Sequence, residues 1–156
     1  MQVIRVQAPD FDIGAEMAAL TLGRTDIGGI ASFVGVVRGT AAGRPIEAMC
    51  LEHYPGMTER ALAHIASDAT TRFDLQACVV VHRIGELRPG DNIVLVMAAS
   101  PHRQSALDGC AFLIDWLKTR APFWKKERFA DGTQQWVDAR EADDAAVSKW
   151  SMPPLS

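Results

Sequence analysis

Cationic side chains gather next to aromatic ones in residues 115–128, which read Asp-Trp-Leu-Lys-Thr-Arg-Ala-Pro-Phe-Trp-Lys-Lys-Glu-Arg. The 156-residue sequence as a whole is slightly acidic, with a formal net charge of -3. Like charges this close repel one another unless water or an anion neutralises them. The segment therefore predicts a binding site for a negatively charged ligand, and its five cations are Lys118, Arg120, Lys125, Lys126 and Arg128.

Two of these lysines occur where we expect their side chains to be held in place. Lys118 ends an apolar helical stripe, and Phe123 and Trp124 stand directly before Lys125, so the aliphatic stems should pack against apolar surface. Neighbouring cations disfavour the ammonium form of a lysine, which lowers its pKa and favours a neutral, reactive amine near pH 7. The alternative is a solvated surface, which is the usual role of a run of charges.

Two further positions favour anion binding. Arg38 ends a glycine-dotted segment and is followed by Gly39, so backbone N–H groups and a guanidinium could together hold a phosphate. His102 and Arg103 fall in the first turn of a predicted helix, where unpaired N–H groups and the helix dipole favour an anion. The alternatives are a plain loop arginine and the ordinary polarity of a helix start.

Composition and charge restrict the class of protein. With 48% hydrophobic and 22% charged residues, the chain predicts one globular domain over residues 1–150 and a flexible tail over 151–156. The acidic balance disfavours a general nucleic-acid binder. The three cysteines form no C-x-x-C pair, and the chain shows neither an apolar leader nor a run of membrane-spanning length. These features predict a soluble, cytoplasmic protein.

The common motifs of cofactor and metal enzymes are absent. No Walker A, G-x-G-x-x-G, H-E-x-x-H or G-x-S-x-G pattern occurs. The sequence therefore gives no support for a kinase, a nicotinamide-dependent enzyme, a zincin or an α/β-hydrolase. Among the scattered histidines only His53, near Cys50, has ligand-like spacing. On a strand those two side chains would face opposite sides of the sheet. We therefore expect no metal site and no cofactor.

Hydrophobic periodicity, glycines and prolines predict an alternation of strands and helices. Asp10 or Asp12 caps the first helix, Pro101 starts the third, Pro122 stops it, and Asp131 begins a hairpin turn. The expected strands cover residues 3–6, 27–38, 46–53, 76–84, 92–100, 123–129 and 134–137, and the expected helices run to about 22 and over 58–73, 101–118 and 139–150. Loops should occupy residues 39–45 and 85–91, and the glycines in residues 27–38 suggest bulges or a close approach of backbones. The mixed order predicts an α+β fold with a mostly antiparallel sheet.

With these residues laid out, the chain resembles the catalytic (large) subunit of molybdopterin synthase, the MoaE family. The resemblance covers about residues 3–150. The matching motifs are Phe-Val-Gly-Val-Val-Arg (33–38), Leu-Glu-His-Tyr-Pro-Gly-Met (51–57), His-Arg-Ile-Gly-Glu-Leu (82–87), Ser-Pro-His-Arg (100–103) and Leu-Lys-Thr-Arg-Ala-Pro-Phe-Trp-Lys-Lys-Glu (117–127).

The resemblance implies a fold, partners and a reaction. The fold would be an α/β hammerhead with an additional small β subdomain. The chain would form a homodimer within a heterotetramer that includes two copies of a small MoaD-like sulfur carrier with a C-terminal thiocarboxylate. The enzyme would be a sulfurtransferase that moves sulfur from that carrier to cyclic pyranopterin monophosphate and forms the dithiolene of molybdopterin. Neither nucleic acid nor a membrane would take part.

The resemblance also implies roles for particular residues. Lys118 and Lys125 would be the catalytic pair. The substrate-binding residues would be Val36, Val37, Arg38, His102, Arg103, Lys126 and Glu127, and the pocket wall would include Phe33, Ile114 and Arg140. Ile114 stands where we expect methionine in relatives, one turn before Lys118.

The mechanism leaves alternatives open. Lys118 could handle proton transfers while Lys125 neutralises the phosphate or the thiocarboxylate, and either lysine could act covalently. Arg103 and Lys118 are fifteen residues apart on one predicted helix, which is roughly 22 Å. A pterin phosphate cannot bridge that distance, so we expect His102 and Arg103 to reach the pocket from the other subunit.

Two other classes of protein are consistent with the same cationic segment. The first is a non-catalytic anion-binding or scaffold module that docks an acidic partner tail. The second is a small RNA-binding domain in which Phe123 and Trp124 stack on bases.

Overall fold

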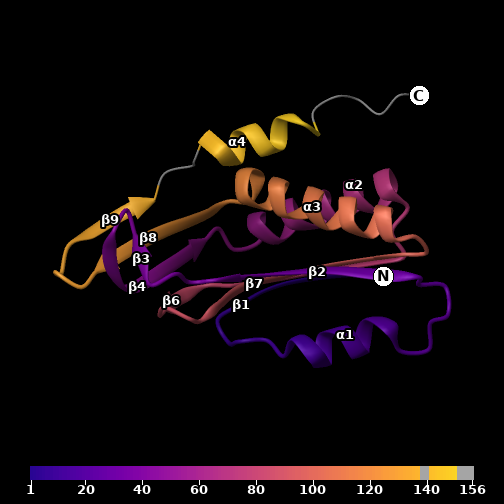
Figure 1. Cartoon of the computed structure of the whole chain (residues 1–156), viewed down its shortest axis with the longest axis horizontal. Helices are drawn as coiled ribbons and strands as arrows, with labels where there is room; N and C mark the ends of the chain where they lie inside the picture. The colour runs from indigo at the N-terminus through magenta and orange to yellow at the C-terminus, as the bar shows by residue number, and fades with distance from the viewer. Residues whose placement is uncertain (138–140, 151–156) are drawn as a thin grey trace.

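The computed structural model describes residues 1–137 and 141–150 and contains two β-sheets with helices packed on the larger one (Figure 1). Helix α1 covers one face of the large sheet, and helices α2 and α3 cover the other. The small sheet lies beyond the end of α3. This arrangement confirms the α+β fold and the predominance of antiparallel pairing.

The large sheet has the strand order β1-β5-β7-β2, formed by β1 (Gln2–Gln7), β5 (Ala77–Arg83), β7 (Asn92–Ser100) and β2 (Gly29–Val36). Strands β5 and β7 pair antiparallel, as predicted, and β1 joins β5 in parallel. Because side chains alternate along a strand, Cys78 and Val80 face α2 and α3 whereas Val79 and Val81 face α1.

Three helices pack on this sheet: α1 (Ile13–Thr21), α2 (Met57–Phe73) and α3 (Arg103–Arg120). Asp12, and not Asp10, caps α1, because its carboxylate accepts a hydrogen bond from the N–H of Ala15 at 3.0 Å. Helix α3 begins two residues after the predicted Pro101, with His102 as its N-cap.

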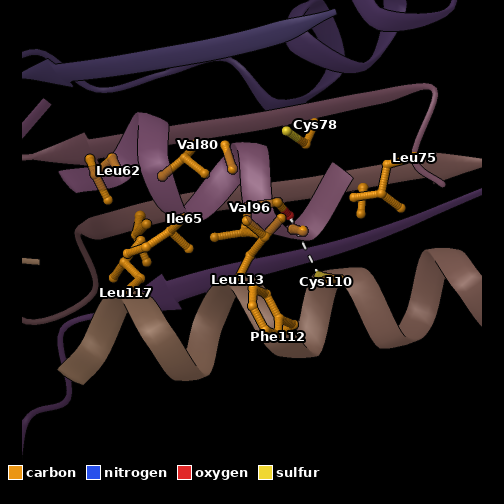
Figure 2. Close-up of a cluster of buried hydrophobic side chains, with 14 residues drawn as sticks. Leu62, Ile65, Leu75, Cys78, Val80, Val96, Cys110, Phe112, Leu113 and Leu117 are labelled. Atoms are coloured by element: carbon orange, nitrogen blue, oxygen red, sulfur yellow. Dashed lines mark hydrogen bonds between the residues drawn. The ribbon is translucent and has the colours of Figure 1, made fainter. Parts of the chain in front are cut away.

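The main core lies between α2, α3 and the large sheet (Figure 2). Leu62 and Ile65 come from α2, Val80 from β5, and Leu113 and Leu117 from α3. Burying one such aliphatic side chain stabilises the fold by about 1.5–3 kcal/mol. Leu117, which is 6% exposed, anchors the last turn of α3 one residue before Lys118.

The small sheet contains β4 (Arg44–His53), β8 (Phe123–Phe129), β9 (Gln134–Val137) and two short strands, β3 (Thr40–Ala41) and β6 (Gly85–Leu87). Both short strands were expected to be loop. The turn between β3 and β4 has positive φ at Ala42 (51°) and Gly43 (77°), the pattern of a tight two-residue hairpin turn. The Asp131 turn is confirmed, because β8 and β9 pair around it.

Helix α4 (Glu141–Ser148) packs on α3, within the predicted 139–150. Beyond it, Trp150 donates a hydrogen bond from Nε1 to the Asp115 carboxylate at 2.6 Å. The predicted tail, 151–156, lies outside the described residues. Within the described part of the chain, no helix has both the length and the apolar character needed to cross a bilayer.

Candidate active site

Lys118 and Lys125 face one cavity of about 400 Å³ where the end of α3 meets the small sheet. Arg38, Glu127 and Val36 also line this space, which we call the lysine cavity. The structure therefore brings together five residues that the sequence analysis assigned to a site. They come from three segments that are distant in the sequence.

Strand alternation explains why β8 presents a lysine and a glutamate to the cavity. Phe123, Lys125 and Glu127 line the cavity from one face of the strand, and the residues between them face the other way. The joint between α3 and β8 is tied to the start of α2, because Thr58 donates a hydrogen bond from Oγ1 to the carbonyl of Pro122 at 3.2 Å. Thr58 is fully buried, so water does not compete for this hydrogen bond between α2 and the segment before β8.

Arg38 reaches the cavity from the segment just after β2, and the pairing of β2 is irregular at that end. The pairing register of β2 and β7 shifts between Gly35 and Val36, so the glycine bulge predicted from the sequence is present. Val37 turns inward instead, at 2% exposure, and packs with Met49 and other residues of the small core. Val37 therefore does not line the lysine cavity, whereas its predicted neighbours Val36 and Arg38 do.

Glu127 is a buried carboxylate beside two amines. Its side chain is 6% exposed, and its Oε2 atom is buried without a hydrogen-bond partner among the described residues. An ionised carboxylate is costly to bury unless cations or donors compensate it. Lys118 and Lys125 line the same cavity.

His82 is a site residue that the sequence analysis missed. It is 3% exposed, and its ring stacks on Phe123 with the ring centroids 3.7 Å apart. With Lys118 and Lys125 it lines a second space of about 100 Å³, which we call the histidine cavity. Burial lowers the pKa of His82 to about 4, and the positive charges of Lys125 and Lys118 add to that effect. The available signal was a histidine directly after the apolar run of β5.

Several predicted pocket residues lie elsewhere. Lys126 occupies the opposite face of β8, with its Nζ 5.2 Å from the ring centroid of Trp136 and Cys50 beside it in a separate hollow. The one-residue offset from Lys125 is the reason, since it reverses the direction of a strand side chain. Phe33 and Ile114 pack against the main core and do not line the lysine cavity. Arg140 lies outside the described residues.

His102 and Arg103 lie at the start of α3, whereas Lys118 lies in its last turn. The helix is continuous between them, so their backbones are roughly 22 Å apart. Neither residue lines the lysine cavity within one chain.

The lysine cavity combines two ammonium groups and a guanidinium with a buried carboxylate. Such a site can bind an anion and move protons at a reacting group, because fixed charges act strongly where water is excluded. Among the described residues, no group of three or more His, Cys, Asp or Glu side chains is arranged to hold a metal ion.

Comparison with known proteins decides the family. The sequence profile of the family described as MoaE protein matches residues 6–120. A molybdopterin synthase catalytic subunit from Ralstonia nicotianae is 54% identical over 152 residues, covering 97% of this chain and 86% of that protein. The chain belongs to the MoaE family. The profile match includes Arg38 and Lys118, and the relative's match extends over nearly the whole chain.

Solved structures agree with MoaE membership. The molybdopterin biosynthesis MoaE protein from Burkholderia ambifaria is 49% identical and superimposes with a TM-score of 0.83 over 98% of this chain and 100% of that one. A complex of subunits 1 and 2 of molybdopterin-converting factor from Helicobacter pylori is 20% identical, with a TM-score of 0.62 over 90% of each chain, and shows the shared fold.

Proposed function

We propose that this MoaE chain is the catalytic subunit of a molybdopterin synthase and acts as a sulfurtransferase. The observation that carries the proposal is the meeting of Lys118, Lys125 and Arg38 in one cavity. The names of the most similar relatives support the same reaction. The alternative, a non-catalytic module that docks an acidic tail, gives no reason for a buried carboxylate in the same cavity as the two amines.

The charges of the cavity suit both substrates of this reaction. A cyclic pyranopterin monophosphate brings an anionic phosphate, and the C-terminal thiocarboxylate of a small MoaD-like carrier brings a second negative charge. Cations placed where negative charge develops stabilise the transition state. The two-subunit complex described for the Helicobacter pylori protein supports the presence of such a carrier.

Each cavity residue then has a role that its position supports. Lys118 handles proton transfers at the carbon that receives sulfur or at the departing carrier carboxylate, and Lys125 neutralises the phosphate or the thiocarboxylate. Arg38 binds the phosphate. The unpaired Oε2 of Glu127 is placed to accept a hydrogen bond from a donor group of the substrate.

The complete site requires a second copy of the chain. His102 and Arg103 are too far from Lys118 along α3 to touch one pterin phosphate in the same chain. A homodimer, itself held in a heterotetramer with two carriers, supplies these residues from the partner subunit. The same arrangement provides further cations for the substrate phosphate.

The proposal also includes a reducing, cytoplasmic location. Cys78 and Cys110 are buried free thiols, and Cys50 is a partly buried one. Unpaired thiols are typical of proteins kept in a reducing compartment.

The test is incubation of the purified chain with a thiocarboxylated carrier and cyclic pyranopterin monophosphate, followed by detection of the dithiolene product. We expect Lys118→Ala and Lys125→Ala each to reduce turnover by about a hundredfold or more, the usual loss for a general acid–base group. Lys149→Ala is the matched control, because Lys149 forms an ion pair with Asp115 away from the cavity at 3.3 Å. Product formation by both cavity variants at the wild-type rate would rule out the catalytic assignment.

A further inference from the structure

Apart from cysteine thiols, two ionisable side chains are buried in the described part of the chain, and both lie beside the lysine pair. Glu127 lines the lysine cavity and has a role in the proposed reaction. His82 is more deeply buried, at 3% exposure. A buried imidazole carries a desolvation cost unless its nitrogen atoms have partners, so its place among the amines requires a physical explanation.

The hydrogen bonding of His82 fixes its tautomer. Its Nδ1 atom lies 2.7 Å from the carbonyl oxygen of Arg83, and a carbonyl only accepts, so Nδ1 carries the proton. Burial disfavours a second proton on the ring, and the nearby Lys125, Lys118 and His53 add to this effect. The ring is therefore neutral at pH 7, and Nε2 has an unshared electron pair that can only accept a hydrogen bond.

The surroundings of the ring direct Nε2 toward the amines. His82 occupies the same face of β5 as Val80, the face covered by α2 and α3. Phe123 covers one side of the ring, and the Nδ1 edge is occupied by the Arg83 carbonyl. The remaining edge is the one that can meet the histidine cavity, whose wall includes Lys118 and Lys125.

We propose that Nε2 of His82 accepts a hydrogen bond from the ammonium groups of Lys118 and Lys125, directly or through water in the histidine cavity, and thereby positions both amines. The proposal rests on the proposed function, in which these amines act on the substrate. His82 is a positioning residue, because it meets the lysines from the protein side. It orients an ammonium group without taking its proton, since a neutral buried imidazole is a much weaker base than an amine.

Three substitutions separate hydrogen bonding from packing. His82→Gln places an amide oxygen near the position of Nε2, His82→Asn retains a donor near Nδ1 but has no group at Nε2, and His82→Phe keeps the stacked ring without nitrogen. We expect kcat to fall about tenfold in the Asn and Phe variants, the effect of losing one hydrogen bond. The Gln variant should recover most of the rate, with KM for the carrier little changed. If the Phe variant were at least as active as the Gln variant, the packing of the ring and not its hydrogen bond would be what matters.

A second measurement does not depend on activity or on the folding of variants. In wild-type protein with ¹⁵N-labelled histidine, proton–nitrogen correlation spectra at pH 7 should show the Nδ1–H tautomer of His82, with the Nε2 resonance shifted by an accepted hydrogen bond. The Nε2–H tautomer, or an Nε2 resonance typical of an unbonded nitrogen, would overturn the proposal. An inactive wild-type protein with the expected spectrum would instead contradict the proposed function alone.

Discussion

At the scale of single residues, the site depends on the protonation of buried groups. Glu127 lines the same cavity as Lys118 and Lys125, and neutral His82 adds an acceptor without adding a third positive charge next to the two lysines. A cationic ring in that position would oppose the binding of protonated amines. The burial that keeps His82 neutral therefore serves the proposed site, and it also makes the stability of the fold depend on pH.

The pKa of His82 predicts how stability depends on pH. Its folded value is about 4, below the ordinary value near 6.5 of an unfolded chain. The unfolded state therefore binds the extra proton between these values, and the stability contributed by neutral His82 is present above pH 6.5 and is lost as pH falls toward 4. We expect a loss of roughly 2 kcal/mol between pH 7 and pH 4.5 from this group.

Urea unfolding of the wild type and of His82→Gln at the two pH values measures this contribution. The Gln variant should lose less stability than the wild type over the same interval, because the titrating group is gone. Acid destabilisation by other groups is shared by both proteins and cancels in the comparison. Equal losses in the two proteins would show that His82 titrates normally.

At the scale of elements, close contacts between backbones hold the segments that carry the site. Gly28 donates a hydrogen bond from its N–H to the carbonyl of Ser100 at 2.9 Å. A Cβ atom at Gly28 would lie 2.0 Å from the carbonyl oxygen of Pro101. The start of β2 thus lies directly against the turn that precedes α3 and carries His102. This is the close backbone approach that the glycines in residues 27–38 predicted.

Gly28→Ala should destabilise the protein by about 2 kcal/mol or more, because the methyl group meets backbone that cannot move aside. Gly29→Ala is the matched control, since its Cβ would be 3.5 Å from the Cα of Arg103, an ordinary contact. Denaturant midpoints of the two variants provide the comparison. Similar midpoints would mean that the turn before α3 is free to shift.

At the scale of the whole molecule, one chain holds only part of the proposed site. Helix α3 has His102 and Arg103 at its start and Lys118 in its last turn, next to the small sheet. A symmetric dimer can bring the start of one α3 to the end of the other, because a two-fold axis repeats each surface. The extent of the domain, residues 1–150, also stays a prediction, since the tail lies outside the described residues.

Subunit mixing tests the shared site. We expect an inactive Arg103→Ala chain and an inactive Lys118→Ala chain, once exchanged, to regain about one quarter of wild-type turnover, because half of the dimers are mixed and each holds one intact site. Mixing Lys118→Ala with Lys125→Ala is the control and should regain nothing, since both residues line the same cavity of one chain. Absence of recovery in the first mixture, with exchange confirmed by mass spectrometry, would show that the sites are not shared.

Local patterns in the sequence determined most of the elements and the chemical type of the site. Hydrophobic periodicity and turn residues predicted the helices and the main strands, because these depend on neighbours within a few residues. The sequence patterns did not predict the short strands β3 and β6, because these strands form by pairing with β4. The density of cations in residues 115–128 predicted an anion site, since charge repulsion over short distances is visible in the sequence itself.

Only the tertiary structure decided which residues face the site. Lys125 and Lys126 are the same residue type and adjacent in sequence, but successive side chains of a strand face opposite sides of the sheet, so the two lysines line different cavities. The Val37 side chain packs in the small core. His82 lies beside the lysines although it precedes Lys118 by more than thirty positions in the sequence. The direction of a side chain is set by long-range pairing and packing, which the order of residues does not display.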